Sequence, residues 1–252
     1  MTETRPPGGR SGVRIKICCI QSADEARMAI NAGADALGLV SEMPSGPGPI
    51  PDGRIRAILL AFPKEFSVLL SSRTDLPSIA RQLDALLPAR PRALQLVDRV
   101  PPGTRRSLKA RYPDLTLIQV VHVEGPESLN GLESDLLPGA DMLLLDSGRP
   151  GSDDAPKQLG GTGRIHDWSI SAAIIRQSPV PVWLAGGLTP DNVAKALRTT
   201  GPDGPYGVDV CSGLRPRGAL DAGRLTAFVE HARATGGSVV PKSEDAARTG
   251  HG

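Results

Sequence analysis

Eight short apolar runs, each followed by an amphipathic segment, constrain the fold of this chain more than any other feature of its sequence. Strands that alternate with helices indicate βαβ units and a parallel sheet, which places the chain in the α/β class. Eight such units favour closure into a (β/α)8 (TIM) barrel. An open doubly wound sheet would require a G-x-G-x-x-G turn near the start, and the sequence has none there. The predicted strands cover residues 13–18, 35–41, 66–71, 93–97, 115–121, 141–145, 180–184 and 207–211.

The repeating units predict a single domain over residues 13–234. The whole chain has 252 residues, close to the usual length of one such barrel, and 39% of them are hydrophobic, which is enough for a large core. The flanking segments, 1–12 and 235–252, are rich in glycine, proline, serine and charge. We expect these two segments to be disordered tails.

Composition argues against several classes of protein. The formal net charge is only +2 and the 29 basic residues are scattered, so we expect no nucleic-acid partner. No apolar run approaches the roughly 18–20 residues that span a bilayer, and the first residues lack the apolar core of a signal peptide. We therefore expect a cytoplasmic protein without a membrane partner. The three cysteines and four histidines lack the spacing of a zinc site, so we expect no metal.

Two candidate catalytic side chains end predicted strands, at the end of the barrel where such enzymes place their chemistry. Cys18 ends the first predicted strand, and Asp146 closes the run M-L-L-L-D. Neither is decisive alone, because a cysteine in a strand is more often a small buried residue and Asp-Ser-Gly is a common turn. Successive strand residues face opposite ways, so we expect only one of Cys18 and Cys19 to face the barrel mouth, with the other packed outward against helices.

Three further side chains, those of Lys16, His122 and Arg73, are candidates for the barrel mouth. Lys16 lies two residues before Cys18 on the same strand face, where its charge would favour a thiolate. His122 ends the fifth predicted strand.

Three glycine-bearing segments follow late strands and predict a phosphate site. Glycine lets the backbone approach a ligand closely, and exposed N–H groups at helix N-termini bind anions. In barrels of this kind a phosphate often binds between the loops after strands seven and eight. The alternative is that these segments are ordinary tight turns. The candidate phosphate-binding and substrate-binding residues are Gly161, Gly163, Gly186, Gly187, Ser212 and Gly213.

The chain resembles the phosphoribosylanthranilate isomerase family, barrels of the ribulose-phosphate-binding type that perform an Amadori rearrangement in tryptophan biosynthesis. The resemblance implies that Cys18 is the general base, that Asp146 is the general acid, and that the glycine loops hold the phosphate of a small-molecule substrate. It implies no cofactor, and it leaves a monomer and a homodimer open. The motifs that carry it are K-I-C at 16–18, A-G-A-D-A-L-G-L-V at 32–40, A-D-M-L-L-L-D-S at 140–147, G-G-T-G-R-I-H-D-W at 160–168, L-A-G-G-L-T-P-D-N-V at 184–193 and G-V-D-V-C-S-G-L at 207–214.

The sequence departs from the family pattern at three places. The family's K-I-C-G is K-I-C-C here, so Cys19 replaces a glycine. The family's Q-L-H-G is Q-L-V-D at 95–98, which removes a histidine. The loop 41–53 lacks the family's arginine for the anthranilate carboxylate and contains Glu42 instead. The candidate replacements for that arginine are Arg73, Arg99 and Arg215.

Two other functions stay open on these departures. One is a paralogous isomerase that keeps the acid, the base and the phosphate site but acts on another phosphorylated sugar or amine. The other is a non-catalytic barrel that binds a sugar phosphate. The presence of both Cys18 and Asp146 argues against this function, because a protein that only binds has no use for an acid and a base. Because the first and eighth strands are neighbours in a closed barrel, a redox-sensitive pair of Cys18 and Cys211 is also conceivable.

Overall fold

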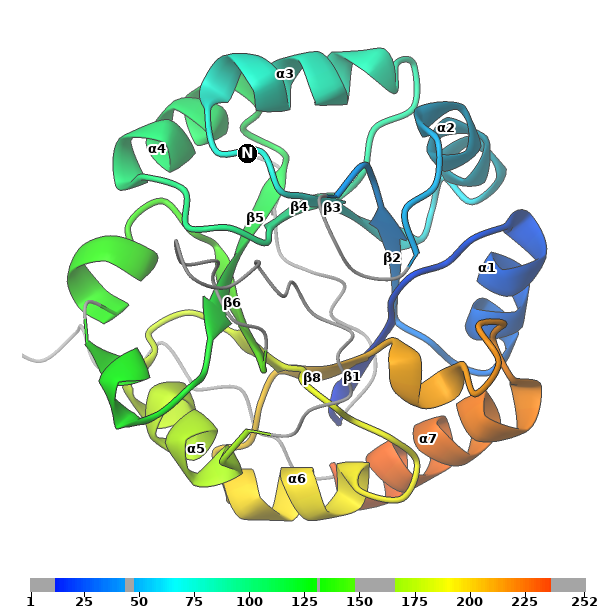
Figure 1. Cartoon of the computed structure of the whole chain (residues 1–252), viewed down its shortest axis with the longest axis vertical. Coiled ribbons are helices and arrows are strands. Elements are labelled where there is room, and N and C mark those ends of the chain that lie inside the picture. Colours follow the sequence, from blue (N-terminus) through cyan, green and yellow to red (C-terminus); the bar gives the residue numbers. More distant parts are fainter. Residues whose placement is uncertain (1–11, 44–47, 131, 148–165, 237–252) are drawn as a thin grey trace, which may run out of the picture.

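The computed structural model describes residues 12–43, 48–130, 132–147 and 166–236. The chain forms a closed barrel of eight parallel strands, which follow one another around the barrel in sequence order, with the helices outside (Figure 1). The predicted fold is therefore confirmed. Residues 1–11 and 237–252, which make up most of the predicted tails, lie outside the described residues. No helix in the described part of the chain is long and apolar enough to cross a membrane.

Each predicted apolar run matches one strand to within two residues at either end. β1 pairs with β2 on one side and with β8 on the other, and the register of the second pairing runs from Arg14 opposite Gly207 to Ile17 opposite Val210. This pairing closes the barrel. The strands are β1 (Arg14–Ile17), β2 (Ala36–Val40), β3 (Phe66–Ser71), β4 (Ala93–Leu96), β5 (Thr116–His122), β6 (Met142–Asp146), β7 (Val182–Leu184) and β8 (Gly207–Val210).

The helices begin where the sequence provides caps. Ser22 Oγ accepts a hydrogen bond from the Glu25 amide at 3.2 Å, and Asp221 accepts one from the Arg224 amide at 2.8 Å. Short helical turns at Pro126–Leu129, Leu132–Leu136 and Ser212–Leu214 complete the described elements. The α-helices are α1 (Ala23–Asn31), α2 (Asp52–Ala61), α3 (Leu76–Ala85), α4 (Pro102–Arg111), α5 (Trp168–Gln177), α6 (Val193–Thr200) and α7 (Ala222–Thr235).

The core has two layers because strand side chains alternate between the inside and the outside of the barrel. The larger layer lies between strands and helices and includes Ile15, Leu39 and Phe228. The smaller layer fills the barrel and includes Trp183, which is 1% exposed. A Cβ atom at Gly207 would lie 2.4 Å from the Trp183 ring, so the glycine on β8 makes room for the indole.

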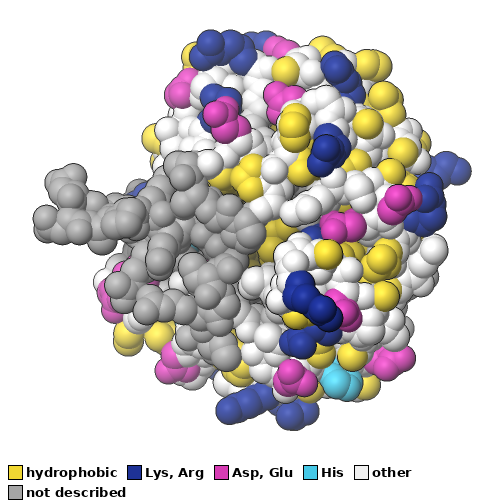
Figure 2. All heavy atoms as spheres, turned by 45° about the vertical axis from the view of Figure 1, so that its right-hand side comes forward, with side chains coloured by type: hydrophobic (Ala, Val, Ile, Leu, Met, Phe, Trp, Pro, Cys, Tyr) yellow, Lys and Arg dark blue, Asp and Glu magenta, His cyan; other side chains and the backbone are white. Residues whose placement is uncertain are grey.

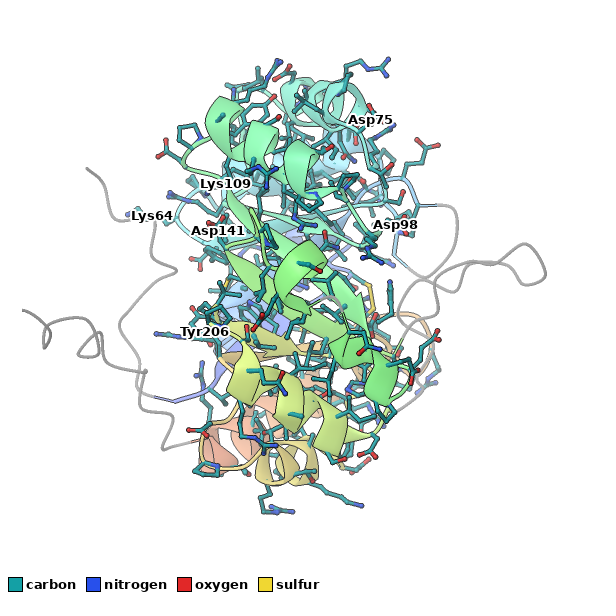
Figure 3. All side chains as sticks on the ribbon, turned by 90° about the vertical axis from the view of Figure 1, so that its left-hand side faces the viewer. Lys64, Asp75, Asp98, Lys109, Asp141 and Tyr206 are labelled. Carbon is teal, nitrogen blue, oxygen red and sulfur yellow. A yellow bond between two sulfur atoms is a disulfide. The ribbon has the colours of Figure 1, made fainter. Side chains whose placement is uncertain are left out.

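The barrel has an amino-end face and a carboxyl-end face, named after the strand ends that lie there. In the side view of Figure 3, Lys64 and Tyr206, which precede β3 and β8, lie on one face, whereas Asp75 and Asp98 lie on the opposite, carboxyl-end face. On the face shown in Figure 2, acidic and basic side chains are interspersed and form no basic patch among the described residues.

The amino-end face of the barrel is held by one carboxylate. Asp35 accepts hydrogen bonds from the Ile15 amide at 2.8 Å, from Arg14 at 3.2 Å and from Arg233 of α7 at 2.5 Å. Beside it, the Val13 amide donates to the Gly236 carbonyl at 3.2 Å. The segment before β1 and the end of α7 are therefore in contact.

Candidate active site

A cavity opens at the carboxyl ends of the strands and collects most of the predicted site residues. Its lining includes the predicted residues Cys18, His122, Asp146, Gly186, Gly187 and Ser212. Lys16, within β1, and Gly213, in the turn after β8, are not part of its lining. Arg73 is outside its lining, and Gly161 and Gly163 fall outside the described residues.

Cys18 lies directly after β1, and its thiol is the free one in the chain. A Cβ atom at Gly38 of β2 would lie 2.8 Å from the Cys18 sulfur, so a glycine on the neighbouring strand provides the space for the thiol. Burial raises the pKa of Cys18 to about 11, although the Lys16 charge acts in the opposite direction. The predicted influence of Lys16 has the expected sign but is smaller than that of burial.

Lys16 is paired with a carboxylate that the sequence analysis missed. Asp209 is its register partner on β8, and the Lys16 Nζ lies 2.9 Å from Asp209 Oδ1 with both side chains buried. Burial alone would lower the pKa of Lys16, but the charges of Asp209 and Cys18 outweigh burial and raise it. Burial also raises the pKa of Asp209. The signal in the sequence was a charged residue within each of two apolar runs that a closed barrel makes neighbours.

Asp146 ends β6, which β7 and β8 separate from β1, and it lines the same cavity as Cys18. Its carboxylate accepts a hydrogen bond from the Ser147 amide at 2.8 Å. Burial raises the pKa of Asp146, while the neighbouring His122 acts to lower it. A buried carboxyl group with a raised pKa is suited to donate a proton.

His122 reaches from β5 towards β4. Its Nε2 lies 3.1 Å from the Val97 carbonyl, which can only accept, so this nitrogen carries the proton. Its Nδ1 is buried and makes no hydrogen bond with the described residues. Val97 holds the position at which the family motif has a histidine, so His122 brings an imidazole to the same part of the mouth from the next strand.

A second histidine, His166, contacts the residue that follows β6. This histidine was not singled out from the sequence. His166 Nδ1 lies 2.8 Å from Ser147 Oγ, and its Nε2 lies 2.6 Å from Ser171 Oγ. Burial lowers the pKa of His166 to about 4, so the ring is neutral at pH 7. A Cβ atom at Gly186 would lie 2.1 Å from Ser147 Oγ, so this contact requires a glycine after β7. Nothing in the local sequence pattern pointed to this contact.

The loops after β7 and β8 pack directly on each other. Gly186 and Gly187 have positive φ angles of 83° and 64°, a conformation that favours glycine. A Cβ atom at Gly213 would lie 2.0 Å from the Leu188 carbonyl oxygen. The glycines therefore bring the loops after β7 and β8 into contact at the edge of the cavity.

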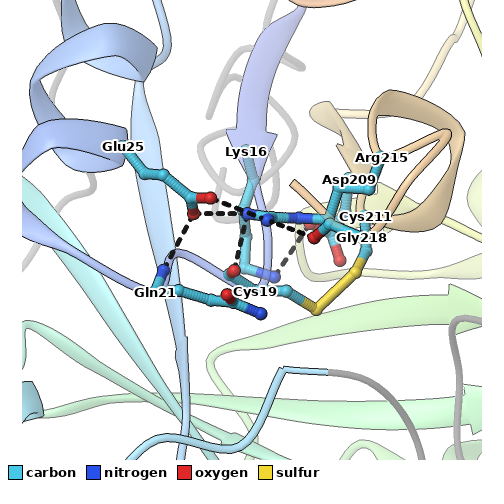
Figure 4. The surroundings of a disulfide bond; sticks show 8 residues. All are labelled: Lys16, Cys19, Gln21, Glu25, Asp209, Cys211, Arg215 and Gly218. Carbon is cyan, nitrogen blue, oxygen red and sulfur yellow. Dashed lines mark hydrogen bonds and ion pairs between the residues drawn. A yellow bond between two sulfur atoms is a disulfide. The ribbon is translucent and has the colours of Figure 1, made fainter. Parts of the chain in front are cut away.

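The expectation that only one of Cys18 and Cys19 faces the barrel mouth is wrong. Cys19 does not pack outward against helices, since it lines the cavity as Cys18 does. Its φ angle of 62° turns the chain immediately after β1, so strand alternation no longer applies. Its sulfur is bonded to that of Cys211, with 5.9 Å between the two Cα atoms (Figure 4). The conceivable pair with Cys211 is therefore formed by Cys19 and not by Cys18.

One candidate arginine is already engaged. Arg215 donates to both carboxylate oxygens of Glu25, at 2.9 and 2.7 Å, and to the Cys19 carbonyl at 2.6 Å (Figure 4). It is 8% exposed and serves to join the loop after β8 to α1. Arg215 is therefore not available for a substrate carboxylate.

Arg73 lies beyond β3 at the rim of the barrel mouth. One of its terminal nitrogens lies 3.7 Å from Glu42, in the loop after β2. Its Nε is buried and makes no hydrogen bond among the described residues. Arg99, beyond β4, is exposed. Within the described ranges, no group of three His, Cys, Asp or Glu residues could hold a metal ion.

Comparisons with known proteins agree on one family. The profile of N-(5'-phosphoribosyl)anthranilate (PRA) isomerase matches residues 114–231. The chain is 33% identical over 224 residues to the N-(5'-phosphoribosyl)anthranilate isomerase of Methanocella arvoryzae, covering 88% of this chain and 99% of that protein. It is 35% identical to the Haloferax volcanii isomerase, covering 90% and 96%.

Solved structures give the same result. The phosphoribosylanthranilate isomerase of Pyrococcus furiosus superposes with a TM-score of 0.71 at 26% identity, covering 88% of this chain and 99% of the other. The enzyme from Thermus thermophilus gives a TM-score of 0.70, also at 26% identity and with the same coverage. A further isomerase structure contains reduced 1-(o-carboxyphenylamino)-1-deoxyribulose 5-phosphate. It superposes with a TM-score of 0.68 at 25% identity, and the match covers 88% of this chain and 99% of the other.

Proposed function

The chain belongs to the N-(5'-phosphoribosyl)anthranilate isomerase family, and we propose that it catalyses that reaction with Asp146 as general acid and Cys18 as general base. The reaction is an aldose–ketose isomerisation of tryptophan biosynthesis and converts N-(5'-phosphoribosyl)anthranilate into the carboxyphenylamino-deoxyribulose phosphate. The single observation that carries the role assignment is that Cys18 and Asp146, far apart in sequence, line one cavity beside the loops after β7 and β8.

Ring opening is the first step, and it needs a proton donor. Asp146 protonates the ribose ring oxygen, the C1–O bond breaks, and the aminoaldose becomes a Schiff base. Burial raises the pKa of Asp146, which favours the protonated form that this step needs. The Ser147 amide at 2.8 Å fixes the orientation of the carboxyl group.

Proton abstraction is the second step. The Cys18 thiolate removes the proton from the sugar C2, giving an enol that tautomerises to the aminoketose. The buried Lys16 charge next to the thiol stabilises the thiolate, and Asp209 at 2.9 Å holds Lys16 in place. Lys16 and Asp209 are therefore positioning residues for the base.

The phosphate and carboxylate of the substrate need separate sites. We assign the phosphate to backbone amides of Gly186, Gly187, Ser212 and Gly213, with Gly161 and Gly163 as further candidates outside the described residues. We assign the anthranilate carboxylate to Arg73, because its Nε is unpartnered and its only described ion pair, with the exposed Glu42, is long at 3.7 Å. The carboxylate would displace Glu42 from the guanidinium.

The proposal is tested by following the loss of fluorescence of freshly generated N-(5'-phosphoribosyl)anthranilate. Cys18→Ala and Asp146→Asn should each lower kcat by at least about a thousandfold, as expected for loss of a general base or acid together with its positioning. Both variants should still bind the reduced product named above, measured by calorimetry. Near wild-type turnover in either variant would overturn the role of that residue.

Arg73→Met tests the carboxylate site. Removing a charge-assisted contact of about 2 kcal/mol should raise KM roughly thirtyfold with little change in kcat. The matched control is Arg99→Met, which removes an exposed arginine from the neighbouring rim position. Equal KM values for the two variants would contradict the assignment of Arg73.

Glu42 is the observation that favours the paralogous isomerase as a second candidate function. A carboxylate in the loop after β2 repels the negatively charged carboxylate of anthranilate. Two measurements separate the two functions: the KM of Glu42→Gln and the turnover of the wild type. A lower KM for the phosphoribosylated anthranilate supports the family reaction. No turnover by the wild type, with retained binding of sugar phosphates, would favour the paralogue.

A further inference from the structure

The Cys19–Cys211 disulfide lies between two parts of the proposed site. Cys19 is adjacent to the proposed base Cys18, and Cys211 precedes Ser212 in the loop after β8. Both cysteines line the cavity, and Cys211 is partly exposed there, so a small reagent can reach the bond through the cavity mouth. The disulfide therefore connects the turn that carries the base with the loop that is assigned to the phosphate.

Cys19 has an unusual backbone conformation. Within the described residues, it is the only non-glycine residue with a positive φ angle, at 62°. Residues with a Cβ atom disfavour this region, whereas glycine enters it freely. Gly48, in the segment before α2, approaches so closely that a Cβ atom on it would lie 2.7 Å from the Cys19 Cβ. The Cys19 side chain is thus held in a turn that its own backbone preference opposes.

We propose that Cys19 and Cys211 form a reversible redox site that controls the position of the Cys18 base. The inference rests on the proposed function for its kinetic consequence. In the oxidised state, the covalent bond holds Cys19 in the left-handed turn. A dithiol reductant donates two electrons and two protons, the S–S bond breaks, two thiols form, and the reductant becomes a disulfide. The turn can then relax towards the extended conformation that residues with a Cβ atom prefer.

The effect of reduction should be local. Arg215 still donates to the Cys19 carbonyl at 2.6 Å and still pairs with Glu25, so β1 and the loop after β8 stay together without the disulfide. What changes is the turn between the proposed base and these contacts. Because small misplacements of a catalytic group lower rates steeply, we expect reduction to lower kcat about tenfold or more and to leave the fold intact.

The experiment compares the full-length protein in its oxidised form with the same protein after reduction by dithiothreitol. Denatured samples should contain one titratable thiol before reduction and three after it, because the chain has three cysteines. Cys211→Ser cannot form the bond and should show the low kcat of the reduced wild type under both conditions. Cys19→Gly combined with Cys211→Ser should match the oxidised wild type under both conditions, since glycine adopts the turn unaided.

Each outcome either supports the proposal or overturns it. Three titratable thiols in air-oxidised protein, or equal kcat values in the two states, would overturn it. Failure of the double variant to recover activity would overturn the role of the turn. If the protein shows no turnover in either state, the proposed function fails, and the rate of Cys18 alkylation by iodoacetamide, followed by peptide mass spectrometry, then decides the redox proposal. A different rate in the two states supports it, and equal rates overturn it.

Discussion

The protonation states of the acid and the base lead to a quantitative prediction about pH. The pKa of Cys18 is about 11 because the thiol is buried, against an ordinary value of 9.0. At pH 8 the thiolate fraction is therefore about 10⁻³, and each pKa unit corresponds to about 1.4 kcal/mol, so the thiolate is about 4 kcal/mol less stable than the thiol. The pKa of Asp146 is raised from 3.8 by burial. The active form has Cys18 deprotonated and Asp146 protonated. When the pair holds a single proton and Asp146 has the lower pKa, most molecules carry that proton on Cys18, so the active form is the less populated one.

This ordering fixes the shape of the pH profile. Between the two pKa values, each rise of one pH unit increases the thiolate tenfold and decreases the protonated carboxyl tenfold, so the active fraction stays constant. The value of kcat/KM should therefore form a plateau, with the acid limb set by Asp146 and the alkaline limb near pH 11 set by Cys18. Alkylation of Cys18 by iodoacetamide needs only the thiolate and should accelerate about tenfold per unit across the same range.

The assay measures both quantities on the oxidised protein, in which Cys18 is the one free thiol. Far-ultraviolet circular dichroism at each pH shows whether the barrel stays folded. A kcat/KM that rises in parallel with alkylation would refute the requirement for a protonated Asp146. An alkylation rate that levels off near pH 9 would refute the argument that burial dominates the thiol.

Three substitutions test other parts of the structure. Gly213→Ala places a methyl group 2.0 Å from the Leu188 carbonyl, which forces the two loops apart, so KM should rise about tenfold; an unchanged KM would remove Gly213 from the phosphate site. Lys16→Met removes the cation beside Cys18 and should slow its alkylation at pH 8 about tenfold, whereas a faster reaction would contradict the sign of the Lys16 effect. Asp35→Ala leaves two arginines and an amide without their acceptor and should lower the free energy of unfolding by about 3 kcal/mol, measured in urea; kcat should not change, because Asp35 lies at the opposite end of the barrel.

The barrel could be predicted because its signal is distributed over the whole chain. Each of the eight apolar runs matches a strand, and closure follows from the number of units. The places of Cys18 and Asp146 followed from the same rule, because both residues come at strand ends. Such predictions need only the position of a residue within its own strand.

Residues whose role depends on two strands at once were harder to find. Lys16 was singled out, but its partner Asp209 lies more than 190 positions away and becomes adjacent only through the register between β1 and β8. The prediction that one of Cys18 and Cys19 packs outward was wrong because strand alternation was applied one residue too far, to a position where the backbone turns. His166 comes 19 positions after Ser147, and no strand or helix pattern relates the two residues, so their contact could not be expected.

The hydrogen bond between Val13 and Gly236 has a consequence for how this barrel can be connected to other polypeptides. The Arg14 amide, next along the chain, donates to the Tyr206 carbonyl, so Val13 and Gly236 lie on the face on which Figure 3 labels Tyr206, away from the cavity. Since these two positions are already in contact, a short linker between residues 12 and 236 would join them without strain, and the order of the eight units could then begin at another turn of the same face. A circularly permuted chain should therefore form the same barrel. A second protein fused at this junction would leave the substrate entrance open.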